Sequence, residues 1–164
     1  MARIGVLTAS DKSAAGERAD VSGALIASRC LAAGHEVVRQ VVLPDERVAI
    51  ATALRVWCDG GTMDVVITTG GTGLTARDVT PEATRDVAER DVPGIPLALG
   101  IAGLQKTPYA ALTRGIAVVR RTTLIVNLPG SPKAVGEGMD VLIPLLGHIA
   151  ELLSGPVEHE PGTS

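Results

Sequence analysis

Short apolar runs alternate with helix-like segments over residues 1–90, and this alternation restricts the possible folds more than any other feature. The strand-like runs are residues 4–9, 35–43 and 64–69. The segments with apolar residues at helical spacing are residues 21–33, 46–59 and 81–90. Alternating strands and helices are typical of a parallel sheet whose crossover helices cover both faces. We therefore expect an α/β fold, a three-layer α/β/α sandwich with a mostly parallel sheet.

The second half of the chain has a less regular pattern. Three glycines and two prolines interrupt residues 92–105, which predicts irregular helix and turns there. Two apolar runs at 116–120 and 123–128 predict either a hairpin or one bent strand. Ser131-Pro132 predicts the start of a long helix that extends to about residue 154 and is kinked or split by Pro144.

The distribution of apolar and charged residues indicates the broad class of the protein. Residues 1–155 have enough apolar content for a single domain, whereas 156–164 are predicted to form a flexible C-terminal tail. No apolar run approaches the ~18 residues that span a membrane, and the N-terminus lacks a secretory signal, so we expect a cytoplasmic protein. The net charge of −3, scattered basic residues and 1% aromatic content argue against a nucleic-acid partner. Cys30 and Cys58 are expected to be reduced thiols in the core.

The most distinctive loop is the glycine-rich segment at residues 68–78, directly after a buried strand. It contains Thr69, Gly70, Gly71, Thr72 and Gly73. Glycines allow backbone N–H groups to approach an anion closely, and threonine hydroxyls add further donors. A phosphate-binding loop and a plain tight turn both fit this pattern. A P-loop does not fit because no Lys follows the glycines, and a dinucleotide fingerprint matches only in part, through Gly71, Gly73 and Ala76.

Two acidic residues follow successive strand-like runs of the chain. Asp45 comes after the second strand, and Asp78 ends the glycine-rich segment. Each could be a cap or turn carboxylate, but both are expected at the same edge of a parallel sheet, where ligands bind. Mg²⁺ that bridges nucleotide phosphates needs only one or two protein carboxylates. The pair therefore predicts a magnesium-assisted phosphoryl or nucleotidyl transfer.

Two other loops at the same edge carry polar groups. Ser10 and Asp11 follow the first strand, and the last strand is followed by Pro129, Gly130, Ser131 and Lys133. A helix that starts at Ser131 could direct its positive end at a phosphate. Turn and cap chemistry accounts for these residues equally well.

Four motifs occur together in this chain: TTGGTG at 68–73, Arg-Asp-Val-Thr-Pro-Glu-Ala at 77–83, Leu-Pro-Asp-Glu at 43–46 and Leu-Pro-Gly-Ser-Pro-Lys-Ala at 128–134. In this order they resemble the MogA/MoaB family of molybdopterin-binding proteins, and the likeness extends over nearly the whole chain.

The resemblance implies a molybdopterin adenylyltransferase that transfers AMP from Mg-ATP to the terminal phosphate of molybdopterin. It implies that Asp78 and Asp45 are catalytic and hold Mg²⁺. The glycine-rich loop is then the nucleotide site, and Ser131 with its neighbours contacts the pterin or its phosphate. The resemblance also implies a homotrimer and a downstream molybdenum-insertion protein as a partner.

Two other functions remain open at this point. Some MoaB-like relatives bind the pterin without a catalytic role, so a non-catalytic binding or scaffold protein is the main alternative. Ser10-Asp11-Lys12 is closer to the MogA-like enzymes. An ordinary NAD-binding enzyme is supported only by the partial glycine match.

Overall fold

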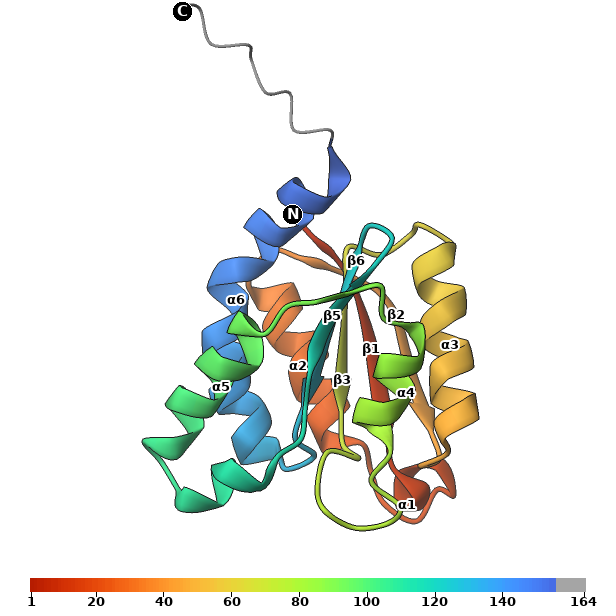
Figure 1. The fold of residues 1–164 in the computed structure, drawn as a ribbon, viewed down its shortest axis with the longest axis vertical. Helices are drawn as coiled ribbons and strands as arrows, with labels where there is room; N and C mark the ends of the chain where they lie inside the picture. The colour runs from red at the N-terminus through yellow and green to blue at the C-terminus, as the bar shows by residue number, and fades with distance from the viewer. Residues whose placement is uncertain (156–164) are drawn as a thin grey trace, which may run out of the picture.

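The computed structural model describes residues 1–155, which form a central six-stranded sheet with helices on both faces (Figure 1). The strands are β1 (Arg3–Ala9), β2 (Glu36–Leu43), β3 (Val65–Thr69), β4 (Arg90–Asp91), β5 (Ala117–Arg120) and β6 (Thr123–Leu128). The helices are α1 (Asp11–Ala14), α2 (Val21–Ala32), α3 (Arg47–Asp59), α4 (Thr80–Val87), α5 (Gly94–Leu104), the 3₁₀ helix η1 (Pro108–Leu112) and α6 (Pro132–Ser154). The strand order is β2-β1-β3-β6-β5-β4.

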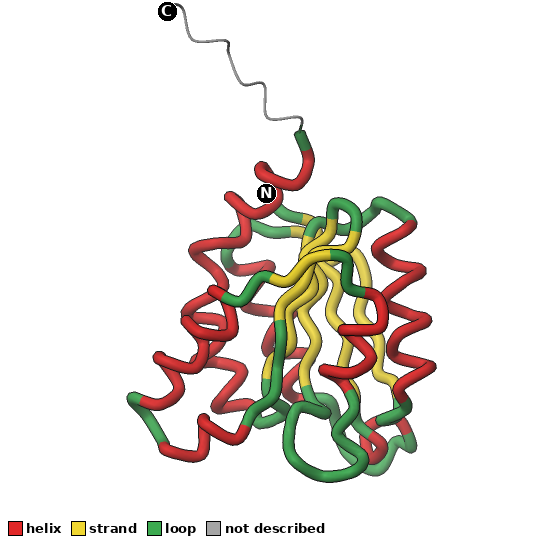
Figure 2. The backbone as a smooth tube through the Cα atoms, viewed as in Figure 1, coloured by secondary structure: helices red, strands yellow, loops and turns green. Residues whose placement is uncertain are grey.

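Strands β2, β1, β3 and β6 pair in parallel, and β5 and β4 are added antiparallel at one edge. The three-layer fold with a mostly parallel sheet is thus confirmed. Figure 2 shows the strands between two groups of helices, with loops gathered at the end of the sheet where β1 and β3 finish. A two-residue β4 ends the sheet, which leaves little unpaired backbone at that edge.

The core divides into two apolar layers because neighbouring strand residues point to opposite faces of the sheet. On one face Val65, Ile67 and Val126 pack with residues of α2 and α6. On the other face Val66 and Ile125 pack with α3 and α4. All five residues of β3 are buried, as expected for a central strand covered on both sides.

The structure corrects three details of the first and third connections. The loop after β1 contains the short helix α1, which Ser10 caps by accepting a hydrogen bond from the backbone N–H of Ser13 (3.2 Å). Helix α4 ends at Val87, short of the predicted Arg90, because Arg90 pairs with Val119 as part of β4. Thr80-Pro81 has the sequence pattern of an N-cap followed by Pro at the first helical position, which predicts Thr80 as the cap of α4. The helix instead begins at Thr80 itself, and its N-cap, Val79, forms no side-chain cap hydrogen bond.

The region from Val92 to Gln105 was predicted to be irregular, but it contains the regular helix α5. Pro96 lies in the first turn, where its missing N–H removes no intrahelical hydrogen bond. A Cβ at Gly103 would lie 2.9 Å from Cβ of Ala110, so the glycine lets η1 pack closely on α5. Strands β5 and β6 form a hairpin, one of the two predicted alternatives. Helix α6 is not split at Pro144 but continues through it as one helix.

Two expectations concern parts of the chain away from the sheet. Cys30 and Cys58 are buried and unpaired, and burial raises the pKa of each thiol to about 11. Within residues 1–155, no helix has both the length and the apolar character needed to cross a bilayer. The predicted tail at 156–164 lies outside the described residues.

Candidate functional site

A cleft of about 960 Å³ opens where β1, β3 and β6 end. Parallel strands bring their following loops to one edge of the sheet, which is where ligands bind in such folds. The cleft is lined by the loops after β1, β3 and β6, by Asp45 in the loop after β2, and by part of α5 and η1. This volume is at the upper end of the range for small-molecule sites.

The glycine-rich loop is held tightly against its neighbours at the base of the cleft. Gly70 has a φ of 88°, and a Cβ at this position would lie 2.2 Å from the backbone oxygen of Ala9. The N–H of Gly70 donates to the carbonyl of Leu128 (3.1 Å), and the hydroxyl of Thr69 donates to the carbonyl of Pro129 (2.7 Å). The ends of β1, β3 and β6 therefore form one continuous surface.

Both acidic residues line this cleft and lie against the glycine-rich loop. A Cβ at Gly71 would lie 3.2 Å from Oδ1 of Asp45, and one at Gly73 would lie 2.8 Å from Oδ2 of Asp78. Only glycines leave both carboxylates this close to the loop backbone. The geometry thus provides two carboxylates on one side of a potential phosphate site.

Asp45 is held by a reciprocal pair of hydrogen bonds. Its Oδ2 accepts from the N–H of Asp11 (2.9 Å), and its own N–H donates to Oδ1 of Asp11 (3.0 Å). The pKa of Asp45 is raised, mainly by burial. The hydrogen bond from the N–H of Asp11 lowers this pKa, whereas the negative charges of Asp11 and Asp78 raise it further. The ionised form of Asp45 is therefore less favourable in the folded protein than in the unfolded chain.

This shift predicts the effect of Asp45→Asn on stability. Below the ordinary carboxyl pKa of ~4, the side chain is neutral in both states and the shift contributes nothing. Above the raised native pKa, the charge destabilises the native state, and Asn removes it while its amide oxygen can still accept from Asp11. We expect Asp45→Asn to unfold at a higher temperature than wild type at neutral pH, with the difference vanishing in acid. The unfolding temperatures of both proteins, measured from acid to neutral pH, test this expectation. A rise in unfolding temperature that is largest in acid would contradict it.

The other predicted residues are divided between the cleft and its rim. Ser10, Thr69, Gly70, Gly71, Thr72, Gly73, Pro129, Gly130 and Ser131 line the cleft, whereas Asp11 and Lys133 do not. The carboxylate of Asp11 forms an ion pair with Arg77 (2.8 Å), which holds the pKa of Asp11 below its usual value. Lys133 is exposed. Ser131 caps α6, its Oγ accepting from the N–H of Ala134 (3.2 Å).

Arg18, Asp20 and Ser22 also line the cleft and were missed by sequence analysis. Asp20 accepts from the hydroxyl of Thr8 (2.8 Å), and Ser22 donates to the carbonyl of Gly130 (2.7 Å). Among the cleft-lining residues that the structure describes, Arg18 is the only one with a cationic side chain. The available signal was the position of Asp20 before a helix, where it caps α2.

One wall of the cleft is more apolar. It comes from α5, η1 and the segment that follows them, and includes Leu99, Leu112 and Thr113. This wall was not predicted from the sequence, because its glycines and prolines indicated irregular structure in place of the regular helix α5.

The dinucleotide fingerprint does not fit the loop. Gly71, Gly73 and Ala76 all precede α4, which begins only at Thr80, so the glycines do not open a helix as that motif requires. The 1–155 region also contains no cluster of three or more His, Cys, Asp or Glu side chains arranged to hold a metal ion.

Comparison with known proteins identifies the family. Residues 5–148 match the family model described as "Probable molybdopterin binding domain". The molybdopterin adenylyltransferase of Helicobacter pylori strain J99 is 39% identical over 155 residues, covering 93% of this chain and 88% of that protein. The molybdenum cofactor synthesis protein cinnamon of Drosophila melanogaster is 40% identical over 155 residues, but this chain spans only 26% of its length.

A solved structure has the same fold. The molybdopterin biosynthesis enzyme MoaB of Thermus thermophilus superposes with a TM-score of 0.88 and 46% identity, covering 95% of this chain and 98% of that one. The family match, the curated relatives and this structure agree with the four motifs around the cleft. The chain therefore belongs to the molybdopterin-binding MogA/MoaB family of molybdenum cofactor biosynthesis proteins.

Proposed function

We propose that the protein is a molybdopterin adenylyltransferase, which transfers AMP from Mg-ATP to the terminal phosphate of molybdopterin and releases pyrophosphate. The observation that carries the proposal is the position of Asp45 and Asp78 beside the glycine-rich loop within one large cleft. The Helicobacter pylori relative, of which this chain covers 88%, has the name of this activity.

The cleft has distinct surfaces for the two substrates. The backbone N–H groups of Gly71–Gly73 and the hydroxyls of Thr72 and Ser10 bind the phosphates of ATP. The N–H of Gly70 and the hydroxyl of Thr69 donate to carbonyls of the protein and so shape the loop instead. The loop at Pro129, Gly130 and Ser131 contacts the pterin or its phosphate. Arg18 adds the positive charge that a cleft containing Asp20, Asp45 and Asp78 needs to bind two anionic substrates.

In the reaction, an oxygen of the molybdopterin phosphate forms a bond to the α-phosphorus of ATP. The bond from that phosphorus to the bridging oxygen of pyrophosphate breaks, and pyrophosphate leaves with the electron pair. Asp45 and Asp78 hold the Mg²⁺ of Mg-ATP, which supplies charge neutralisation at the phosphates. The chain contributes mainly by positioning the two phosphates in line.

A pyrophosphate-release assay with purified protein, molybdopterin and Mg-ATP tests this function. We expect release that depends on molybdopterin and exceeds a control without protein. Tight molybdopterin binding without release would instead support a non-catalytic binding protein, in which Asp45→Ala changes affinity alone. The absence of dinucleotide binding in calorimetry would exclude the NAD-binding alternative.

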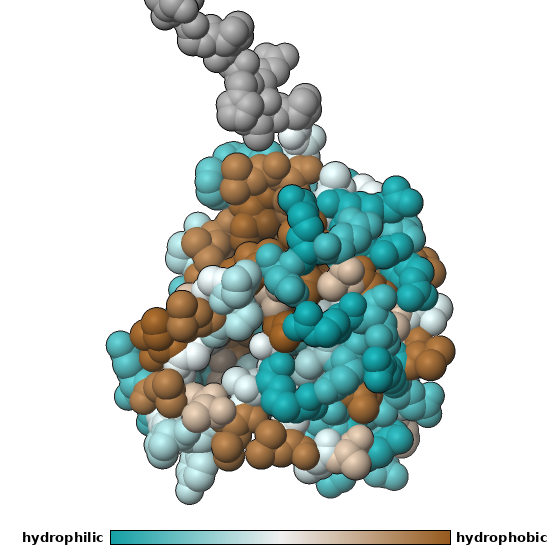
Figure 3. Space-filling view, viewed as in Figure 1, coloured by the Kyte–Doolittle hydropathy of each residue, from teal (hydrophilic) through white to brown (hydrophobic). Residues whose placement is uncertain are grey.

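We further propose that the protein is a homotrimer and acts in the cytoplasm with a downstream molybdenum-insertion protein. Leu97, Ile101 and Leu104 have a helical spacing on α5 and are 53–64% exposed. Figure 3 shows hydrophobic residues gathered over the α5 side of the molecule. An exposed apolar stripe of this kind suits contact with further copies of the chain.

The Drosophila relative extends well beyond the matched region, which supports a partnership with further cofactor-assembly domains.

The apolar stripe on α5 gives a prediction for assembly. Ile101→Glu introduces a charge into the stripe, and we expect the protein to become monomeric because a buried, unpaired carboxylate is strongly unfavourable. Light scattering coupled to gel filtration measures the mass of wild type and variant. Val48→Glu, at an exposed residue on α3, is the control and should leave the mass unchanged. A variant with the same mass as a trimeric wild type would contradict this interface.

A further inference from the structure

The segment between Gly73 and Asp78 has few means of holding its own shape. It contains no helix or strand, and Leu74, Thr75, Ala76 and Arg77 are exposed. Within it, the N–H of Thr75 donates to Oδ2 of Asp78 (3.0 Å), and the N–H of Asp78 donates to the carbonyl of Thr75 (3.1 Å). These bonds close a turn around Asp78, and the ion pair between Arg77 and Asp11 (2.8 Å) holds the turn on one side.

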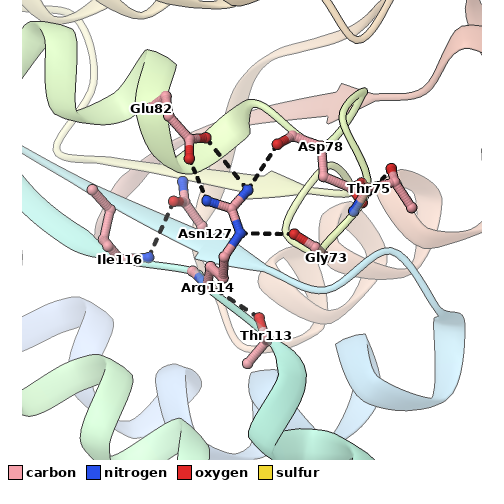
Figure 4. Close-up of polar contacts among 9 residues, drawn as sticks. Gly73, Thr75, Asp78, Glu82, Thr113, Arg114, Ile116 and Asn127 are labelled. Carbon is pink, nitrogen blue, oxygen red and sulfur yellow. Dashed lines mark hydrogen bonds and ion pairs between the residues drawn. The ribbon is translucent and has the colours of Figure 1, made fainter.

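Arg114, between η1 and β5, attaches both ends of the segment to the rest of the protein (Figure 4). Its Nε donates to the carbonyl of Gly73 (2.8 Å), and one terminal nitrogen donates to the carbonyl of Asp78 (2.8 Å). Its backbone N–H also donates to the carbonyl of Thr72 (2.8 Å). One residue thus contacts the two ends of the segment and the residue before it.

The guanidinium group is itself oriented by Glu82, in the first turn of α4. Its second terminal nitrogen forms an ion pair with Oε1 of Glu82, and Figure 4 shows the carboxylate and the two loop carbonyls around the guanidinium. The hydrogen bond from Arg114 lowers the pKa of Glu82. Three acceptors at fixed positions require the planar fork of Arg, because the single ammonium of Lys cannot reach all of them.

We propose that Arg114 is a positioning residue of the cleft, which fixes the segment from Gly73 to Asp78 so that the Asp78 carboxylate points at the bound nucleotide. Arg114 is not among the cleft-lining residues, so it acts through Asp78 rather than on a substrate. The inference rests on the proposed function, because it assigns Asp78 to Mg-ATP. It adds a residue that neither the motifs around the cleft nor the acidic pair identified.

Hydrogen exchange of the loop amides tests the positioning without using activity. In Arg114→Gln the backbone bond to Thr72 remains and the side-chain contacts are lost. We expect the amides of Thr75 and Asp78 to exchange at least ~10-fold faster, a change of about 1.4 kcal/mol in local opening. Arg114→Lys should exchange nearly as fast as Arg114→Gln.

Arg120→Gln is the matched control. Arg120 forms an ion pair with Asp59 (2.9 Å) and donates to the carbonyl of Val87 (3.2 Å), but it does not contact the loop. It should leave exchange at Thr75 and Asp78 unchanged. Unchanged exchange in Arg114→Gln, or equal acceleration in Arg120→Gln, would overturn the proposal.

Calorimetry of Mg-ATP binding tests whether Arg114 works through Asp78. We expect Arg114→Gln to weaken binding by ~10-fold in the wild-type background and by less than about 2-fold in Asp78→Asn, because coupled residues are not additive. An equal loss of Mg-ATP affinity in both backgrounds would show that Arg114 does not act through Asp78. If wild type transfers no AMP while Arg114→Gln still frees the loop, the proposed reaction fails and the loop-fixing role of Arg114 is supported.

Discussion

Asp78→Asn is expected to reduce pyrophosphate release by about 10²- to 10³-fold, the loss typical of removing one electrostatic partner from a transition state. The amide oxygen of Asn can still accept from the N–H and hydroxyl of Thr75, which now donate to Oδ2 of Asp78 at 3.0 and 2.7 Å. The loop should therefore keep its shape while its charge is lost. Steady-state release with saturating molybdopterin measures the effect, and thermal unfolding checks that the variant is folded.

Asp140→Asn is the matched control for this substitution. Asp140, on α6, forms an ion pair with Arg29 (2.6 Å) and is not among the cleft-lining residues. The Asp140→Asn variant should release pyrophosphate at the wild-type rate. Asp78→Asn with more than about half of the wild-type rate would mean that Asp78 has no catalytic role.

Gly70→Ala is expected to lower the free energy of unfolding by about 3 kcal/mol or more, since it combines backbone strain with overpacking. The φ of 88° is unfavourable for any residue with a Cβ, and the added carbon would lie 2.2 Å from the backbone oxygen of Ala9. Neither β1 nor β3 can move without disturbing the sheet. Urea denaturation measures the loss.

Gly16→Ala separates the two contributions to this loss. Gly16 has a similar φ of 75°, but an added Cβ would meet nothing within 4 Å. Gly16→Ala should lower the free energy of unfolding by only about 1 kcal/mol, the strain of the left-handed backbone. If both substitutions lower the free energy of unfolding equally, the close contact between Gly70 and β1 is not important for stability.

The fold could be predicted largely from the sequence because each central strand is a short apolar run bounded by glycines or polar residues. Residues of β3 are buried on both faces, so the pattern contains no competing helical period. Helix α5 could not be predicted from the sequence, because prolines and glycines usually interrupt a helix. There Pro96 occupies the first turn and Gly103 faces η1, and neither effect is visible in a local pattern.

The candidate site was predictable to the extent that it follows strands. Asp45, Asp78 and the glycine-rich loop were located from the rule that ligands bind where parallel strands end. Arg18 and Arg114 could not be found in this way. The contact of Arg114 with Asp78 joins residues 36 positions apart, and such pairings depend on tertiary packing rather than on sequence spacing. Thr80 illustrates the reverse case, since a cap predicted from local sequence became a buried hydroxyl without a hydrogen-bond partner among the described residues.

The central claim is that this cleft joins AMP to the phosphate of molybdopterin. Mass spectrometry of molybdopterin after incubation with the purified protein and Mg-ATP tests it most directly. We predict a product whose mass increases by one adenylyl group with wild type and Asp140→Asn, and little or none with Asp78→Asn. Recovery of only unmodified molybdopterin, under conditions where the protein binds both substrates, would contradict the account.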